Sequence, residues 1–113
     1  MKRSEIWLIN LDPTIGAEIR KKRPAVIVNA DSVGVLPLRV IIPITKWKEQ
    51  YTKAPWMVFL NPNSENNLEM PSCADTFQVR SVSRNRFINP LGKVTANKMK
   101  EIELALSKVL GLS

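Results

Sequence analysis

The chain has 113 residues, 44% of them hydrophobic, and 17 basic against 10 acidic side chains give it a net charge of +7. Its length is that of one domain, so the sequence predicts one domain spanning residues 1–113. It shows neither the roughly 18 apolar residues of a membrane-spanning helix nor the apolar stretch of a signal peptide. The single cysteine, Cys73, cannot form an internal disulfide, which predicts a cytoplasmic protein.

The excess of positive charge indicates a polyanionic partner, most simply RNA or DNA, although an acidic protein would fit the same charge. The chain contains no histidine, the commonest general base and metal ligand. One cysteine is too few for a zinc site, and no clustered carboxylate pair offers a magnesium site. The sequence therefore predicts no metal and no cofactor.

The first half of the chain indicates short strands. Apolar and β-branched residues at 6–11 predict a strand, and a charged loop follows at 14–22. Pro24 can open the apolar strand predicted at 25–29, since a first-strand residue can lack its N–H. A further strand at 38–42 is expected to stop at Pro43.

The second half changes character near its end. The polar segment 46–53 is expected to form a short helix or an open loop. Strand patterns follow at 56–60, at 73–83 as one strand or a bent pair, and at 87–92. The last segment, 95–110, has apolar residues at positions 99, 102, 106, 109 and 110, which is helical spacing and predicts a helix that buries this stripe in the core. Thr95 and Gly111 suit its N-cap and C-terminal cap, so the fold predicted is mainly β with a C-terminal helix.

A run of four cations, Arg20 to Arg23, ends against Pro24. Arg23 is thereby attached to the start of a strand, whereas the other three cations belong to the preceding loop. A guanidinium held on a scaffold beside a basic loop suits a phosphate-binding site.

Several blocks in chain order resemble the MazF/PemK-type toxins of type II toxin–antitoxin systems. These blocks are Glu5–Trp7, Asp12–Glu18, Lys22–Val28, Ile41–Thr45, Cys73–Ser81 and Leu110–Leu112. The resemblance implies a small SH3-like barrel of the CcdB/MazF kind that forms a homodimer. It also implies metal-independent, sequence-specific cleavage of single-stranded RNA, messenger RNA in particular, which arrests translation and growth. The products would carry 2′,3′-cyclic phosphate and 5′-hydroxyl ends, and a cognate antitoxin would block the site.

By position in these motifs, Arg23 and Thr45 match the family's catalytic arginine and threonine. The arginine would offer forked donors to the phosphate oxygens, and the threonine hydroxyl would fix the phosphate or relay a proton. Both residues also have ordinary structural explanations. Arg23 could form a surface ion pair with Glu18, and Thr45 could bond its hydroxyl to nearby backbone.

The general base is less defined. Where some relatives have an acidic residue before the glutamine of the block Cys73–Ser81, this chain has Phe77. Strand alternation predicts that Asp75 and Phe77 share a face, so Asp75 could substitute, with Glu18 as a second auxiliary carboxylate. Glu18 and Gln78 are also candidates for reading base edges.

The remaining candidates would hold RNA through phosphate contacts or base stacking, although basic residues often form nothing more than a solvated surface. Trp47 is expected to stack on bases more readily than Trp56, which belongs to the core. The RNA-binding set is Lys21, Lys22, Lys46, Trp47, Lys48, Phe77, Gln78, Arg80, Arg84 and Arg86.

Three alternative functions remain open on the sequence. A gyrase-directed toxin of the CcdB kind could share the barrel, but the C-terminal helix has no aromatic residue for that role. A non-catalytic RNA-binding barrel would share the charge. A toxin that has lost its activity, for instance through Phe77, would share both fold and motifs.

Overall fold

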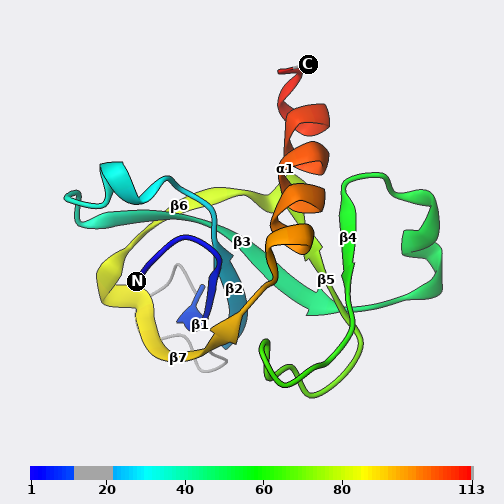
Figure 1. Ribbon diagram of the computed structural model, residues 1–113, viewed down its shortest axis with the longest axis horizontal. Helices are drawn as coiled ribbons and strands as arrows, with labels where there is room; N and C mark the ends of the chain where they lie inside the picture. The colour runs from blue at the N-terminus through cyan, green and yellow to red at the C-terminus, as the bar shows by residue number, and fades with distance from the viewer. Residues whose placement is uncertain (12–21, 113) are drawn as a thin grey trace.

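The computed structural model describes residues 1–11 and 22–112, so most of the predicted loop at 14–22 lies outside it (Figure 1). The described residues form seven strands, four short 3₁₀ helices and one α-helix. The strands are β1 (Glu5–Asn10), β2 (Lys22–Ile27), β3 (Leu38–Lys46), β4 (Met57–Leu60), β5 (Ser72–Asp75), β6 (Arg80–Ser83) and β7 (Phe87–Lys93). The helices are η1 (Asp31–Val33), η2 (Glu49–Lys53), η3 (Thr76–Gln78), η4 (Arg84–Arg86) and α1 (Ala96–Leu110).

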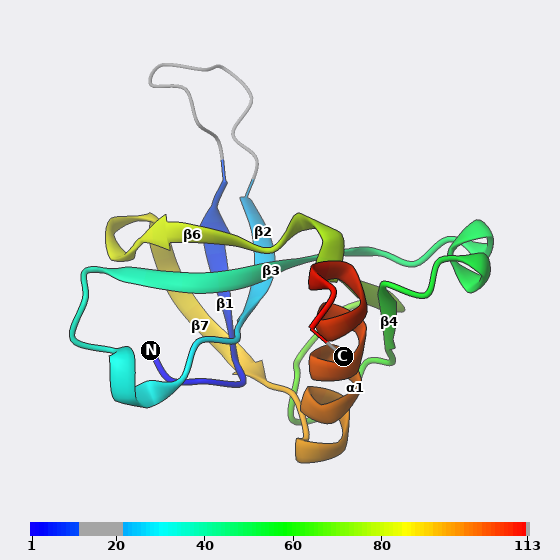
Figure 2. The ribbon, with the colours of Figure 1, turned by 90° about the horizontal axis from the view of Figure 1, so that it is seen from above.

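The strands form one antiparallel sheet in the order β4-β5-β3-β2-β1-β7, with β6 paired to β3 off this path. Strand β3 is the centre of the sheet. It pairs with β2 along one edge and, along the other, with β6 by its first half and β5 by its last residues. Figure 2 shows β6 and β3 crossing over β1, β2 and β7, while α1 stands beside β4. This arrangement confirms the predicted mainly β fold with a C-terminal helix.

The prediction that the third strand stops at Pro43 is wrong, because β3 continues to Lys46. Pro43 lies opposite Ala25 of β2. On its other side it falls between Ile41, the last residue paired with β6, and Ile44, the first residue paired with β5. A residue without an N–H is tolerated where the hydrogen-bonded ladder changes partner. The longer strand places Thr45 inside the sheet rather than after it.

Strand β2 also differs from its prediction. It begins at Lys22, three residues before the expected start, because β1 continues far enough to pair Asn10 with Lys22 and Ile9 with Arg23. Arg23 is therefore a strand residue with a partner on β1. The segment 73–83 is a bent pair of strands around η3, which was one of its two predicted alternatives. The segment 46–53 contains the short helix η2, which was likewise one of the two alternatives predicted there.

Both faces of the curled sheet are covered. Val26 and Ile42 belong to the core between the sheet and α1, together with Ile102 of the helix. Their neighbours Ile27 and Ile41 point the other way, into a second core that contains Ile9 and Val82. Buried residues on both faces explain why β2 and β3 are continuous apolar stretches rather than alternating ones.

Helix α1 is capped as predicted. The Thr95 hydroxyl accepts a hydrogen bond from the Lys98 N–H at 3.2 Å, and Gly111 adopts the left-handed conformation at φ 68°. Met99, Ile102 and Ala105 are buried against the sheet. The predicted inclusion of Leu110 in the buried stripe is wrong, because the end of α1 rises beyond the strands and leaves Leu110 51% exposed (Figure 1). No helix in the described residues is long and apolar enough to cross a membrane.

Candidate active site

The candidate site forms where β2 and β3 diverge. The pairing of β2 with β3 ends at Ala25 and Pro43, and the same register counted two residues further sets Arg23 opposite Thr45. There the Arg23 guanidinium Nη1 donates a hydrogen bond to Thr45 Oγ1 at 3.2 Å. Thr45 had been given a structural explanation in which its hydroxyl bonds nearby backbone. Within the described residues the Thr45 hydroxyl oxygen instead accepts the hydrogen bond from Arg23. The suggested partner of Arg23, Glu18, lies outside the described residues.

Arg23 and Thr45 line a hollow of about 460 Å³, which we call the polar hollow. It brings together three further predicted site residues, Asp75, Gln78 and Arg80, which come from the end of β5, from η3 and from the start of β6. Residues separated by more than fifty positions thus meet in one cavity. The complete lining is Leu11, Arg23, Pro43, Thr45, Tyr51, Asp75, Gln78 and Arg80.

Asp75 lies in the polar hollow, but the prediction that it shares a strand face with Phe77 is wrong. The chain turns into η3 immediately after Asp75, whose carboxylate accepts the Phe77 N–H at 3.1 Å and so caps that helix. Burial raises the pKa of the Asp75 carboxyl, although the backbone N–H groups of Phe77 and Gln78 act in the opposite direction. Phe77 is 64% exposed and packs edge-on against Trp56, with ring centroids 5.8 Å apart.

Tyr51 is a lining residue that the sequence analysis missed. It lies in η2, where Trp47 packs edge-on against it with ring centroids 6.0 Å apart. Trp47 also packs edge-on against Phe59 of β4, with ring centroids 5.0 Å apart. Trp47 therefore supports one wall of the polar hollow through Tyr51. The signal available in the sequence was a lone tyrosine in the polar segment that follows Thr45.

A second hollow, of about 350 Å³, also includes Arg23 and Thr45 in its lining. We call it the apolar hollow, since leucines, a proline and an isoleucine form much of its surface. Its lining is Leu8, Arg23, Pro24, Ile44, Thr45, Lys46, Asn67, Leu68, Glu69, Met70, Ser72 and Leu91. Lys46 is the predicted RNA-binding residue on this side. The segment 67–70 was not singled out from the sequence.

The other predicted RNA-binding cations are more dispersed. Lys22, Lys48 and Arg84 are exposed, and none of them lines either hollow. The Arg86 guanidinium donates to the carbonyl of Asn10 at 3.2 Å, which ties η4 to the end of β1. Lys21, like Glu18, lies outside the described residues.

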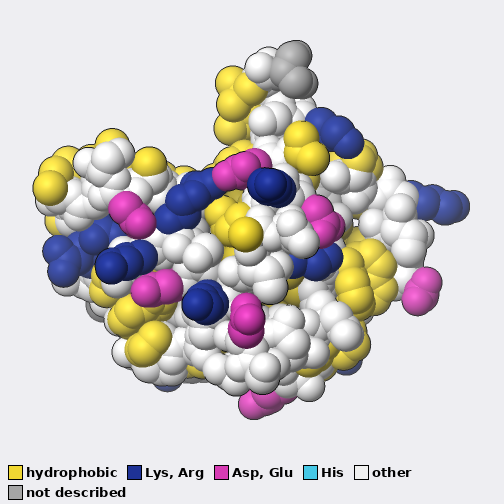
Figure 3. All heavy atoms as spheres, in the orientation of Figure 1, with side chains coloured by type: hydrophobic (Ala, Val, Ile, Leu, Met, Phe, Trp, Pro, Cys, Tyr) yellow, Lys and Arg dark blue, Asp and Glu magenta, His cyan; other side chains and the backbone are white. Residues whose placement is uncertain are grey.

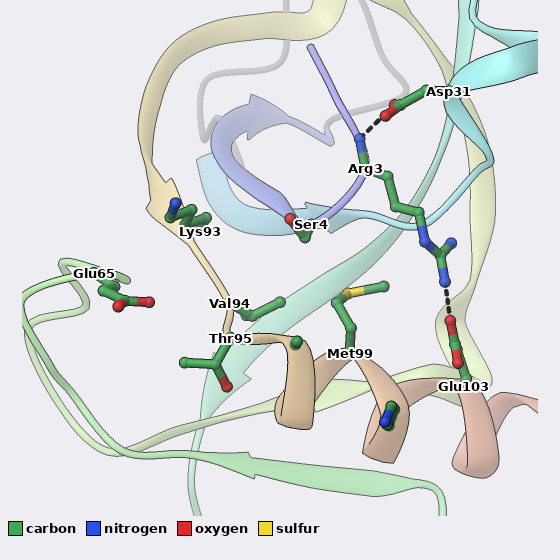
Figure 4. Close-up of a pocket in the computed structure, with 11 residues that line it drawn as sticks. Arg3, Ser4, Asp31, Glu65, Lys93, Val94, Thr95, Met99 and Glu103 are labelled. Carbon is green, nitrogen blue, oxygen red and sulfur yellow. Dashed lines mark hydrogen bonds and ion pairs between the residues drawn. The ribbon is translucent and has the colours of Figure 1, made fainter.

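A larger hollow of about 670 Å³ opens at the start of α1, away from these residues (Figure 4). Its most prominent cation, Arg3, is already occupied. The guanidinium bonds the Glu103 carboxylate and the Val28 carbonyl, and the Arg3 N–H donates to Asp31 at 2.8 Å. The same face of the molecule carries Lys and Arg side chains interspersed with Asp and Glu (Figure 3). This hollow is therefore a less suitable phosphate site than the one at Arg23.

No three side chains of His, Cys, Asp or Glu within residues 1–11 and 22–112 are grouped so that they could hold a metal ion. The chemistry available in the polar hollow is that of a guanidinium, a hydroxyl and a partly buried carboxyl. This set can stabilise a phosphate, donate a hydrogen bond to it and accept a proton.

Residues 2–110 match the family model described as PemK-like, MazF-like toxin of type II toxin–antitoxin system. The chain is 31% identical to Endoribonuclease MazF9 of Mycobacterium tuberculosis over 119 aligned residues, which cover 99% of this chain and 98% of that protein. It is 30% identical to Endoribonuclease MazF of Staphylococcus saprophyticus, covering 99% of this chain and 92% of the relative.

Solved structures share the fold. A mycobacterial endoribonuclease in complex with its cognate antitoxin has a TM-score of 0.81 at 19% identity, covering 100% of this chain and 97% of that one. MazF from Deinococcus radiodurans has a TM-score of 0.77 at 24% identity, covering 98% of this chain and 96% of the other. The fold that this chain shares with these structures is a small curled antiparallel sheet with a C-terminal helix. The chain belongs to the PemK-like, MazF-like toxin family of type II toxin–antitoxin systems.

Proposed function

We propose that this protein is a metal-independent endoribonuclease toxin that cleaves single-stranded RNA at the Arg23–Thr45 pair. The observation that carries the proposal is the hydrogen bond between these two side chains inside a hollow that also holds Asp75, Gln78 and Arg80. Two relatives named as endoribonucleases, similar over nearly their whole length, support the same reaction.

The reaction needs charge stabilisation where the phosphorane forms. The Arg23 guanidinium supplies forked donors to the non-bridging oxygens of the phosphate, which carry the developing charge. Because Thr45 Oγ1 accepts a hydrogen bond from Arg23, its own hydroxyl proton remains available to the phosphate. The two residues thus hold the scissile phosphate together.

The 2′-oxygen attacks the phosphorus, the bond to the 5′-oxygen breaks, and the products are a 2′,3′-cyclic phosphate and a 5′-hydroxyl. The proton of the attacking 2′-hydroxyl passes to the Asp75 carboxylate, and water protonates the leaving 5′-oxygen. A carboxyl whose pKa is raised by burial is a better base than a solvated one while it remains ionised. Gln78 and Arg80 line the same hollow, where Gln78 would read a base edge and Arg80 would contact a neighbouring phosphate.

The wider role follows from family membership. We propose a cytoplasmic homodimer that cuts RNA at a short sequence, with messenger RNA as its main substrate, and so arrests translation and growth. A cognate antitoxin would block the site. The mycobacterial neighbour solved with its cognate antitoxin supports such a partner.

Single-turnover cleavage of a single-stranded RNA by wild type and Arg23→Ala, with RNA affinity measured separately, tests the proposal. We expect at least about a 100-fold loss of cleavage, as for removal of a charge-stabilising donor. Affinity should fall much less, because one phosphate contact is lost among several. Lys100→Ala, which removes an exposed cation on α1, is the matched control and should cleave normally. Near-normal cleavage by Arg23→Ala would refute the assignment, and equal losses in binding and cleavage would favour a non-catalytic RNA-binding protein.

A further inference from the structure

Arg23 and Thr45 belong to the linings of both hollows, so the pair forms a partition between them. A phosphate held at this partition has one nucleoside attached on either side. One nucleoside would therefore extend toward the polar hollow and the other toward the apolar hollow. The apolar hollow measures about 350 Å³, which lies within the usual range of small-ligand pockets.

The surface of the apolar hollow suits the flat face of a base. Leu8, Leu68 and Leu91 contribute half-buried side chains, and Met70 is 43% exposed. A base inserted here would shield apolar surface from water and would also be fixed in direction by the phosphate at Arg23. Unpaired RNA bases are commonly held by packing of one face and hydrogen bonding of one edge.

Glu69 is the acidic residue among the described lining residues. It is exposed, and no ion pair or hydrogen bond within the described part of the chain occupies its carboxylate. Two of its polar neighbours are already engaged, since the Asn67 amide donates to the Leu91 carbonyl at 2.6 Å and the Ser72 hydroxyl donates to the Met70 carbonyl at 2.8 Å. A carboxylate only accepts hydrogen bonds, so it favours a base edge that carries an amino group.

The segment that carries Glu69 is organised before any ligand binds. Asn66 is 3% exposed, and its side-chain oxygen accepts the N–H groups of Asn63 and Leu68, both at 3.0 Å. Its amide donates to the Asn61 carbonyl at 2.9 Å. Asn67, at φ 52°, takes the left-handed conformation that lets the chain turn toward β7. A preorganised loop can discriminate between bases because little ordering is needed on binding.

We infer that the apolar hollow binds the base adjacent to the scissile phosphate and that Glu69 selects the bases that carry an amino group, namely adenine, cytosine and guanine, over uracil there. The inference rests on the proposed function and assigns part of the sequence specificity of RNA cleavage to the segment Asn67–Met70. Adenine, cytosine and guanine each present an amino group on the pairing edge, whereas uracil presents one N3–H between two carbonyl oxygens that a carboxylate repels.

The test is cleavage of a randomised RNA pool, with base frequencies measured at the positions immediately 5′ and 3′ of each cut. We expect wild type to favour the three amino-bearing bases over uracil at one of these positions by about 5-fold or more. Glu69→Gln adds a donor to the same shape and should remove most of that preference without changing the other position. Glu65→Gln, which removes an exposed carboxylate that lines neither hollow, should cut like wild type.

The possible failures are distinguishable. Cutting by Glu69→Gln with wild-type base frequencies at both positions would overturn the inference and leave the proposed function standing. An absence of cutting by folded wild type would overturn both. Met70→Ala supplies an independent check, since it should slow cutting for every base at the same position while keeping the preference for amino-bearing bases.

Discussion

Gly92 of β7 offers a direct test of how the fold positions the segment 61–71. A Cβ at this position would lie 2.1 Å from the Glu65 carbonyl oxygen and 2.9 Å from the Asn66 carbonyl carbon. Both are backbone atoms, so no side-chain rotation relieves the clash. The loop would have to move by roughly 1 Å to bring the closest contact to 3.0 Å. We therefore expect Gly92→Ala to displace the loop that carries Glu69.

The expected loss of stability follows from the contacts that this displacement would strain. The Lys93 N–H donates to the Glu65 carbonyl at 3.0 Å, and the Asn67 amide donates to the Leu91 carbonyl at 2.6 Å. Two hydrogen bonds at about 1 kcal/mol each, with overpacking strain of about 1 kcal/mol or more, give a loss of about 3 kcal/mol. For a domain of this size, that corresponds to a fall in Tm of about 10 °C.

Urea and thermal unfolding of wild type and Gly92→Ala measure this loss. Gly111→Ala is the matched control, since nothing lies within 4 Å of its added Cβ and the cost is that of the left-handed backbone alone, at φ 68°. That cost is about 1 kcal/mol. If the free energy of unfolding of Gly92→Ala lies within about 0.5 kcal/mol of the wild-type value, the segment 61–71 does not pack closely against β7.

Three further results are expected. Thr45→Val should slow cleavage by about 10-fold or more. The double variant with Arg23→Ala should lose less cleavage activity than the product of the two single losses, because the two side chains are hydrogen-bonded to each other. A multiplicative loss would show that the two residues act independently. Burial, and secondarily the Asp75 charge, raises the pKa of the Cys73 thiol to about 11. Iodoacetamide at pH 8 should therefore modify Cys73 in the native protein at least about 100-fold more slowly than Cys73 in the unfolded chain. Equal rates would contradict the burial of this thiol. Burial also raises the pKa of Asp75, so the folded protein holds this proton more tightly than the unfolded chain. The free energy of unfolding should therefore fall as pH rises through that raised pKa, and Asp75→Asn should remove this part of the pH dependence; an unchanged profile would contradict the shift.

Local patterns predicted the elements well because they depend on neighbouring residues. Thr95 and Gly111 mark the ends of α1 through their own capping chemistry. The error at Pro43 arose from a tertiary feature, since the proline lies where β3 changes partners. The exposure of Leu110 depends on how far the helix extends past the sheet, which its spacing cannot report.

The site was predictable only in part. The cation run before Pro24 indicated Arg23 as a phosphate ligand, and the resemblance added the catalytic roles of Arg23 and Thr45, whereas their hydrogen bond depends on the register between β2 and β3. Alternation placed Asp75 beside Phe77, but the Asp75 carboxylate caps a 3₁₀ helix and so ends the strand between them. Tyr51 and Glu69 reach the hollows through loop geometry, for which the sequence offers no periodic signal.

The most direct test of the central claim is cleavage of a long mixed-sequence RNA by wild type and Arg23→Ala in excess EDTA, with every product end mapped by sequencing. The proposal predicts cuts at one short recurring sequence that leave 5′-hydroxyl ends, persist without divalent metal and disappear in the variant. Cuts that require added magnesium, or that Arg23→Ala makes as readily as wild type, would contradict it.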